Sequence, residues 1–129
     1  MLPRLSNVPQ LNNVVSDYLN ELQKQHFEGD IASNYADRLS LATDNSVYQQ
    51  LPQAILFPKS VADVVRITKL ANKEKYLHLT FTPRGGGTGT NGQSINNNII
   101  VDLSRHMTSI LELNIEERWV RVQAGVVKD

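Results

Sequence analysis

Residues 82–94 read Thr-Pro-Arg-Gly-Gly-Gly-Thr-Gly-Thr-Asn-Gly-Gln-Ser, and the rest of the chain is organised around this stretch. It holds five of the seven glycines of the chain, namely Gly85, Gly86, Gly87, Gly89 and Gly92. Glycine has no Cβ, so another group can approach its backbone closely, and successive amides can form a concavity for an anion. Charge and hydroxyl groups are supplied by Arg84, Thr88, Thr90 and Ser94. The stretch therefore predicts a loop that binds phosphate or pyrophosphate.

A flexible connection is the simplest alternative for such a glycine-rich run. Two observations argue against it. The run starts abruptly after the strand-like residues 77–82 and is soon followed by the strand-like residues 99–103. A floppy linker also has no need for three adjacent glycines preceded by Pro83 and Arg84.

Two known phosphate loops fit the stretch poorly. The Walker loop requires a lysine and a Ser/Thr after its last glycine, whereas Gln93 follows Gly92. Residues 87–92 fit G-x-G-x-x-G, but a Rossmann site requires a helix to begin within that pattern. Residues 93–98 are a poor helix start, and Glu112, at the distance of the Rossmann acid, lies on a strand of its own.

Length and charge place limits on what the chain can be. Its 129 residues are one domain or a piece of one, and 13 Lys+Arg balance 13 Asp+Glu. This balance gives no reason to expect nucleic acid or an acidic membrane surface as a partner. The sequence lacks cysteine, a transmembrane run and a secretory signal, so we expect a cytoplasmic protein without disulfides or a thiolate metal site. Three scattered histidines, without metal-ligand spacing, are His26, His78 and His106.

Apolar periodicity predicts the elements that precede the loop. We expect an amphipathic helix over about residues 9–26, with Asn7 as a possible cap, and then a short helical turn within residues 33–41. A buried strand at residues 54–57 is followed by a helix that Ser60 caps, with Asp63 in the capping-box position. The next predicted strand is residues 77–82. The basic residues of this second helix are expected to lie mostly on a solvated face.

These elements predict an α+β fold with an α/β-like start. Strand, helix and strand over residues 54–82 form a βαβ unit, so its strands should be parallel with a right-handed crossover. The glycine loop then leaves the carboxyl end of the second strand, the edge at which open α/β sheets bind ligands. A small antiparallel or mixed sheet should follow, with residues 110–113 and 119–122 as a hairpin. Gly125 marks a second place where backbone could approach a ligand.

Four motifs in order resemble a known family. They are residues 54–64 (AILFPKSVADV), 84–93 (RGGGTGTNGQ), 100–105 (IVDLSR) and 120–126 (VRVQAGV). The resemblance is to the FAD-linked oxidases and dehydrogenases of the vanillyl-alcohol oxidase/p-cresol methylhydroxylase type, in the D-lactate and D-2-hydroxyglutarate dehydrogenase branch. It covers roughly residues 44–129, and the helical N-terminus looks like the start of large bacterial proteins that fuse such a dehydrogenase to an iron–sulfur domain.

The resemblance implies that the glycine loop wraps the FAD pyrophosphate, mainly through backbone amides. The implied cofactor-binding residues are Arg84, Gly85, Gly86, Gly87, Thr88, Gly89, Thr90, Gly92, Gln93, Ser94 and Gly125, with Thr88 and Ser94 as hydroxyl donors. Some members tether flavin through a histidine in or beside this loop. The corresponding region here has none, which implies non-covalent FAD.

The resemblance also implies how much is missing. We expect residues 1–45 to be an N-terminal helical segment and residues 46–129 to be the first, truncated subdomain of an FAD-binding domain. Catalytic residues and any iron–sulfur cluster would lie beyond Asp129. The full protein would oxidise a D-2-hydroxy acid and pass electrons to an iron–sulfur or quinone-linked acceptor, and the 129 residues alone would be inactive and bind FAD weakly or not at all.

Two other functions stay open from the sequence. The loop could serve a non-enzymatic module that binds a mononucleotide phosphate, or the chain could be an interaction or structural unit with the loop disordered. No chemistry is assigned to residues 44–48, which predict a turn with Asx-type hydrogen bonds. We expect His106 to be an exposed turn residue and His78 to be packed or paired on its strand.

Overall fold

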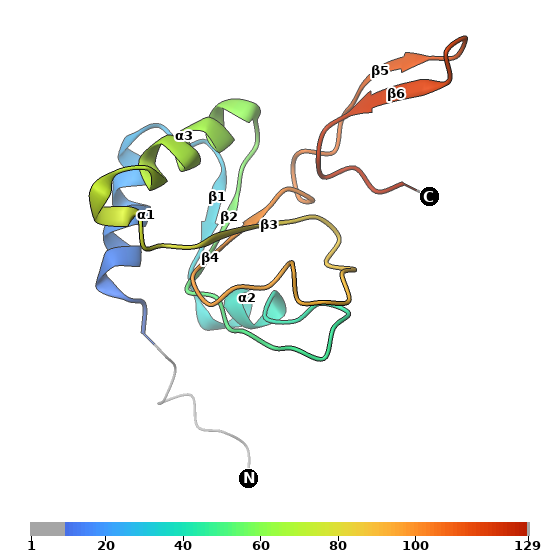
Figure 1. Ribbon diagram of the computed structural model, residues 1–129. Helices are drawn as coiled ribbons and strands as arrows, with labels where there is room; N and C mark the ends of the chain where they lie inside the picture. The colour runs from blue at the N-terminus through green and yellow to red at the C-terminus, as the bar shows by residue number, and fades with distance from the viewer. Residues whose placement is uncertain (1–9, 129) are drawn as a thin grey trace.

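A four-stranded mixed sheet lies at the centre of the computed structural model, which describes residues 10–128 (Figure 1). Two helices pack on one face of this sheet, and a separate hairpin projects away from it. The elements in order are α1 (Asn13–Lys24), β1 (Asp30–Ala32), α2 (Tyr35–Ser40), β2 (Ala54–Phe57), α3 (Val61–Ala71), a short 3-10 helix (Glu74–Tyr76), β3 (Phe81–Arg84), β4 (Ile99–Asp102), β5 (Ile110–Asn114) and β6 (Trp119–Val122).

The sheet has the strand order β1-β2-β4-β3. Strands β2 and β3 each pair in parallel with β4, so the predicted parallel orientation of the βαβ strands is confirmed. They are not neighbours, because β4 lies between them, with Ile100 opposite Ile55 on one side and Thr82 on the other. Strand β1, which the sequence did not predict, pairs antiparallel with β2 at the edge.

Burial explains why β2 and β4 occupy the centre. All residues of both strands are buried, which is typical of parallel strands covered on both faces. Their side chains alternate between two apolar clusters. One is the main core, which contains Leu56 and Val101 together with α1 and α3, and the smaller one contains Ile55 and Ile100.

Helix α1 is shorter than predicted. It begins at Asn13 because the Asn12 side chain accepts a hydrogen bond from the amide of Val14, and it ends at Lys24. The proposed cap Asn7 lies outside the described residues. The apolar stripe of α1 packs into the same core as β2 and β4, where the Tyr18 hydroxyl donates to the carbonyl of Ile67 in α3 (2.9 Å).

The main core contains residues from both sides of the domain boundary that was expected between residues 45 and 46. The N-terminal helix and the sheet bury their apolar side chains against each other, as the Tyr18 contact illustrates. The proposed two-part description stays a prediction, and the structure adds that the described residues on both sides of the boundary pack together.

The cap predicted for α3 is confirmed, because the Ser60 hydroxyl accepts from the amide of Asp63 (3.2 Å). The Asp63 carboxylate is fully buried and does not complete a capping box. It accepts hydrogen bonds from the amides of Glu28 and Lys59 (both 3.0 Å) and from Arg66 (3.0 Å). Asp63 thus ties the turn after α1 to the start of α3.

The boundaries of the strand before the glycine loop were predicted wrongly. Residues 77–80 are not a strand, because a 3-10 helix ends at Tyr76 and β3 begins only at Phe81. His78 is therefore exposed in a loop, and the expectation that it would be packed on a strand is wrong. The shift brings Arg84 into the strand as its last residue.

The hairpin of β5 and β6 was predicted and is confirmed. It projects from the body of the molecule, and almost all of its residues are exposed (Figure 1). Apolar side chains such as Ile110, Leu113 and Val120 are at least half exposed. No helix within residues 10–128 is long and apolar enough to cross a membrane.

Candidate functional site

The glycine loop joins the carboxyl end of β3 to the amino end of β4. Because β3 and β4 are parallel, their carboxyl ends meet at one edge of the sheet, with Arg84 opposite Asp102. The loop starts at this edge and runs beside the segment that follows α2 (Figure 1). Its predicted position at the ligand-binding edge of the sheet is the position observed.

Unpaired amides form the first half of the loop. Within the part of the chain that the structure describes, the N–H groups of residues 85–90 have no protein acceptor. A Cβ added to Gly85 would meet no atom within 4 Å, and one added to Gly86 would meet only Thr88, at 3.7 Å. Bare backbone at these two glycines is therefore open to an approaching anion, as an amide-lined phosphate site requires.

Arg84 lies beneath this half of the loop. Its side chain is only 8% exposed, and Nη1 donates to the carbonyl of Ser94 (3.4 Å), so the two ends of the loop are joined. Gly87 folds over the guanidinium with φ of 67°. A Cβ at Gly87 would lie 2.3 Å from Nη2 of Arg84, so this position requires glycine for both reasons.

The second half of the loop is shaped by its own side chains. Gln93 folds beneath Gly89, and its Oε1 accepts from the amide of Asn91 (3.0 Å). Thr88 and Thr90 are exposed and can turn toward a ligand. The predicted site residues from Arg84 to Ser94 therefore form one continuous loop, in which Arg84 and Gln93 contact the loop itself.

Residues 44–48 lie against the end of the loop, although no chemical role was predicted for them. The Ser94 hydroxyl donates to Oδ2 of Asp44 (3.0 Å), and Gly92 lies so near Tyr48 that a Cβ there would be 3.0 Å from the ring. The predicted Asx turn is present, since the amide of Ser46 donates to Oδ1 of Asp44 (2.8 Å). Hydrogen bonds from Ser46 and Ser94 hold the pKa of Asp44 below its ordinary value.

Asn96 is a second residue that sequence reasoning missed. It is 7% exposed, and its amide group donates to the hydroxyl of Thr82 (2.9 Å) while accepting from the hydroxyl of Thr80 (3.0 Å). Together with the Arg84 contact, it fastens the exit of the loop to β3. The only signal in the sequence was the asparagine run at residues 96–98, which is also typical of an ordinary turn.

Gly125 lies beside Leu103, which is hydrogen-bonded to Arg84 at the start of the loop. Its N–H donates to the carbonyl of Met107 (2.9 Å), and a Cβ would lie 2.0 Å from the carbonyl oxygen of Leu103. The amide of Leu103 in turn donates to the carbonyl of Arg84 (2.9 Å). Close approach of the chain to itself thus explains the glycine, and its predicted contact with a cofactor stays a prediction.

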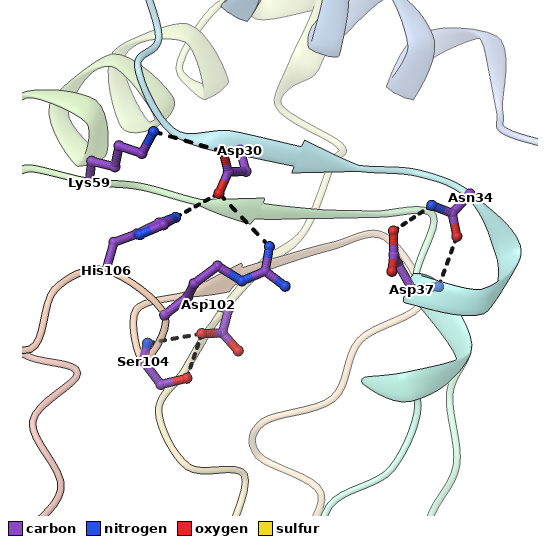
Figure 2. A network of polar contacts seen from close by, with 8 residues as sticks. Asp30, Asn34, Asp37, Lys59, Asp102, Ser104 and His106 are labelled. Atoms are coloured by element: carbon purple, nitrogen blue, oxygen red, sulfur yellow. Dashed lines mark hydrogen bonds and ion pairs between the residues drawn. The ribbon is translucent and has the colours of Figure 1, made fainter.

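His106 is not the exposed residue that its turn suggested. It is half-buried, with Nε2 2.6 Å from Oδ2 of Asp30 on the edge strand, as Figure 2 shows. This hydrogen bond, with smaller help from Lys59 and Arg105, holds the pKa of Asp30 below its ordinary value. The cluster joins the turn after β4 to β1, and Arg105 also stacks over the ring of Phe57 (3.4 Å). These contacts favour a structural role for His106, which joins this turn to β1, over the role of a catalytic base.

Other candidate sites among the described residues fit phosphate less well. An apolar groove of about 450 Å³ lies between α3 and the strands β3 and β4, lined by residues such as Val64, Phe81 and Leu103. No positively charged residue lines it, so it does not suit an anion. Within residues 10–128 no group of three His, Cys, Asp or Glu side chains is placed to hold a metal ion.

Several basic residues near α3 are paired as well as solvated. Lys73 and Lys75 both form ion pairs with Glu21 of α1, and Arg66 pairs with Asp63. Each of these three side chains already has a carboxylate partner, which makes this face a weaker candidate for phosphate than the glycine loop.

Residues 52–129 match the family model described as an FAD binding domain. The whole chain is 81% identical to D-2-hydroxyglutarate dehydrogenase of Haemophilus influenzae and 58% identical to that of Escherichia coli K12. Each alignment covers 100% of this chain but 13% of the relative. The chain therefore spans about one eighth of the length of these curated relatives.

Solved structures share the fold at low sequence identity. An alkyldihydroxyacetonephosphate synthase superposes with a TM-score of 0.75 and 19% identity, covering 96% of this chain and 26% of the other. The 4-ethylphenol oxidase from Gulosibacter chungangensis superposes with a TM-score of 0.67 and 18% identity, covering 90% of this chain and 23% of the other. The α+β fold class predicted from the sequence is confirmed by this likeness.

Proposed function

The chain belongs to the FAD binding domain family, which makes FAD its cofactor, and from this premise we propose that the glycine loop binds the FAD pyrophosphate. The observation that supports the assignment best is the run of unpaired amides at residues 85–90, with open backbone at Gly85 and Gly86. Hydrogen bonds from amides to a charged group are each worth about 1.5–3 kcal/mol. The positive charge of Arg84 beneath the loop adds a favourable field at no cost of reorganisation.

Each part of the loop has a distinct task in this proposal. The amides of residues 85–90 bind, while Gly87 keeps the turn that aims them and the exposed hydroxyls of Thr88 and Thr90 add donors. Arg84, Gln93 and Ser94 hold the loop in shape through contacts within the protein. Gly125 is proposed to border the same site. We propose non-covalent binding, because the loop contains no histidine to form a tether.

We propose that the whole protein is a flavin-dependent dehydrogenase of D-2-hydroxy acids, of the D-2-hydroxyglutarate type. The names and high identity of the relatives support this substrate class. When bound, the flavin supplies the hydride chemistry, and this chain supplies binding and orientation of the dinucleotide. The electron acceptor and a cytoplasmic location are left as predictions, and the substrate-binding residues are expected outside these 129 residues.

Flavin content tests the role of the loop. We expect the full-length Gly86→Val and Gly87→Val variants to purify without flavin. A valine at Gly86 fills the open space that the pyrophosphate needs, whereas a valine at Gly87, at φ of 67° and against Arg84, disrupts the turn of the loop. Absorbance near the flavin maximum relative to protein absorbance measures the occupancy, and a circular dichroism spectrum checks the fold. Normal flavin content in both folded variants would exclude the loop as the pyrophosphate site.

Ligand choice separates this proposal from a simple nucleotide-binding module. Titration of the flavin-stripped full-length protein with FAD, ADP and NAD should give much tighter binding of FAD than of the other two. Equal affinity for ADP and FAD would favour the module. We expect the 129-residue chain alone to bind FAD weakly, because it spans only a small part of its relatives' length.

A further inference from the structure

Ser94 is held at two of its atoms by residues from different parts of the chain. Its carbonyl oxygen accepts from Nη1 of Arg84 (3.4 Å), and its hydroxyl donates to Oδ2 of Asp44 (3.0 Å). Arg84 comes from the start of the glycine loop, whereas Asp44 precedes β2 and is 50 residues away from Ser94 in sequence. Since Ser94 is only 7% exposed, these contacts fix the exit of the loop.

Asp44 is itself held in place. Its Oδ1 accepts from the amide of Ser46 (2.8 Å), and its lowered pKa keeps the carboxylate ionised at neutral pH. An ionised carboxylate only accepts hydrogen bonds, so the single hydrogen of the Ser94 hydroxyl is directed at Asp44. That hydrogen is then not available to a phosphate oxygen, and the carboxylate, being an anion, is not a phosphate ligand.

The same segment covers the loop at a second point. The ring of Tyr48 lies against Gly92, which adopts φ of 75° and lies two residues before Ser94. Residues 44–48 therefore contact the second half of the loop at both Gly92 and Ser94. This segment precedes residue 52, where the match to the FAD binding domain model begins.

We propose that Asp44 is a positioning residue for the cofactor, acting through the hydroxyl of Ser94 to hold the glycine loop in its binding conformation. The inference rests on the proposed function of that loop. With the exit fixed at Ser94, the segment that carries the unpaired amides of residues 85–90 does not have to be ordered by the cofactor. Preorganisation of this kind raises affinity by removing the entropy cost of ordering the loop during binding.

A double-mutant cycle in the full-length holoenzyme tests the proposal. The variants are Asp44→Ala, Ser94→Ala and the double substitution, and FAD affinity is measured by titrating flavin-stripped protein. Each single variant should weaken FAD binding about tenfold, the loss of one hydrogen bond to a charged group. Since both substitutions remove the same contact, the double variant should also lose about tenfold, and not about a hundredfold.

Activity at saturating FAD separates positioning from a general loss of structure. We expect kcat of Asp44→Ala with D-2-hydroxyglutarate and an artificial electron acceptor to equal that of the wild type once FAD saturates, while its half-saturating FAD concentration rises about tenfold. The matched control is Asp17→Ala, which removes an exposed carboxylate of α1 and should leave FAD affinity unchanged. A second variant, Asp44→Asn, keeps the side-chain shape and should lose less affinity than Asp44→Ala.

Several outcomes would overturn the proposal. These are wild-type FAD affinity in Asp44→Ala, additive losses in the double variant, or a kcat that stays low at saturating FAD. Failure of the proposed function would look different, because the Gly86→Val and Gly87→Val variants would then keep normal flavin content. An effect of Asp44→Ala on FAD affinity with no effect of Ser94→Ala would also refute the route through Ser94.

Discussion

Gly87→Ala in the full-length protein should weaken FAD binding by disrupting the loop from within. An alanine at φ of 67° costs about 1–2 kcal/mol, since this left-handed region is unfavourable for any residue with a Cβ. The added Cβ would also lie 2.3 Å from Nη2 of Arg84, so the guanidinium must move away from Ser94. Loss of that charged hydrogen bond adds about 1–2 kcal/mol.

The two contributions together amount to about 2–4 kcal/mol, or roughly 30-fold to 700-fold in FAD affinity at 1.4 kcal/mol per tenfold. Titration of the flavin-stripped protein with FAD measures the change. Hydrogen exchange of residues 84–94 without FAD should become faster, because the loop is altered before any cofactor arrives.

Gly85→Ala is the matched control, since its Cβ would meet no atom within 4 Å. We expect unchanged hydrogen exchange in the flavin-free Gly85→Ala protein and weaker FAD binding, because only the approach of the pyrophosphate is obstructed. FAD affinity of Gly87→Ala within threefold of the wild type would refute the reasoning. Equally fast exchange in both variants would show that the free space at Gly85 and the close contact of Gly87 with Arg84 make no difference to the flavin-free loop.

Two other substitutions probe contacts outside the glycine loop. Gly125→Ala places a Cβ 2.0 Å from the carbonyl oxygen of Leu103, where backbone cannot move aside, and should lower the free energy of unfolding by about 3 kcal/mol, as judged by urea denaturation against Gly85→Ala. Glu21→Gln should remove a pH-dependent part of the stability, because hydrogen bonds from Lys73, Lys75 and Tyr76 lower the pKa of Glu21 from 4.5 to about 2. This depressed pKa gives a contribution that is present above pH 4.5 and is lost as pH falls toward 2, so the difference between wild type and variant in urea unfolding should shrink over that window; a constant difference would contradict the assignment.

Local patterns were sufficient to predict much of the fold. The apolar periodicity of α1 and α3, the Ser60 cap and the hairpin of β5 and β6 all depend on residues close in sequence. The position of the glycine loop after a strand could be predicted for the same reason. Its assignment to pyrophosphate rested on the glycine pattern together with the order of the other motifs.

The errors arise where contacts join distant residues. Residues 77–80 alternate like a strand, but Leu79 packs into the core from a loop and pairing with β4 starts only at Phe81. His106 was predicted to be exposed because its partner Asp30 is 76 residues away in sequence. Likewise, nothing near Ser94 in the sequence indicates that Asp44 accepts its hydroxyl hydrogen.

The place of β4 in the sheet has a consequence for how the protein is made. Strands β2 and β3 leave the ribosome first, yet neither has its parallel partner until residues 99–102 have been synthesised. A nascent chain that ends at residue 98 therefore leaves one edge of the apolar β2 unpaired, because β1 pairs only with its other edge. Because the glycine loop is anchored at one end by β3 and at the other by the residues that lead into β4, its observed shape requires both strands to be in the sheet.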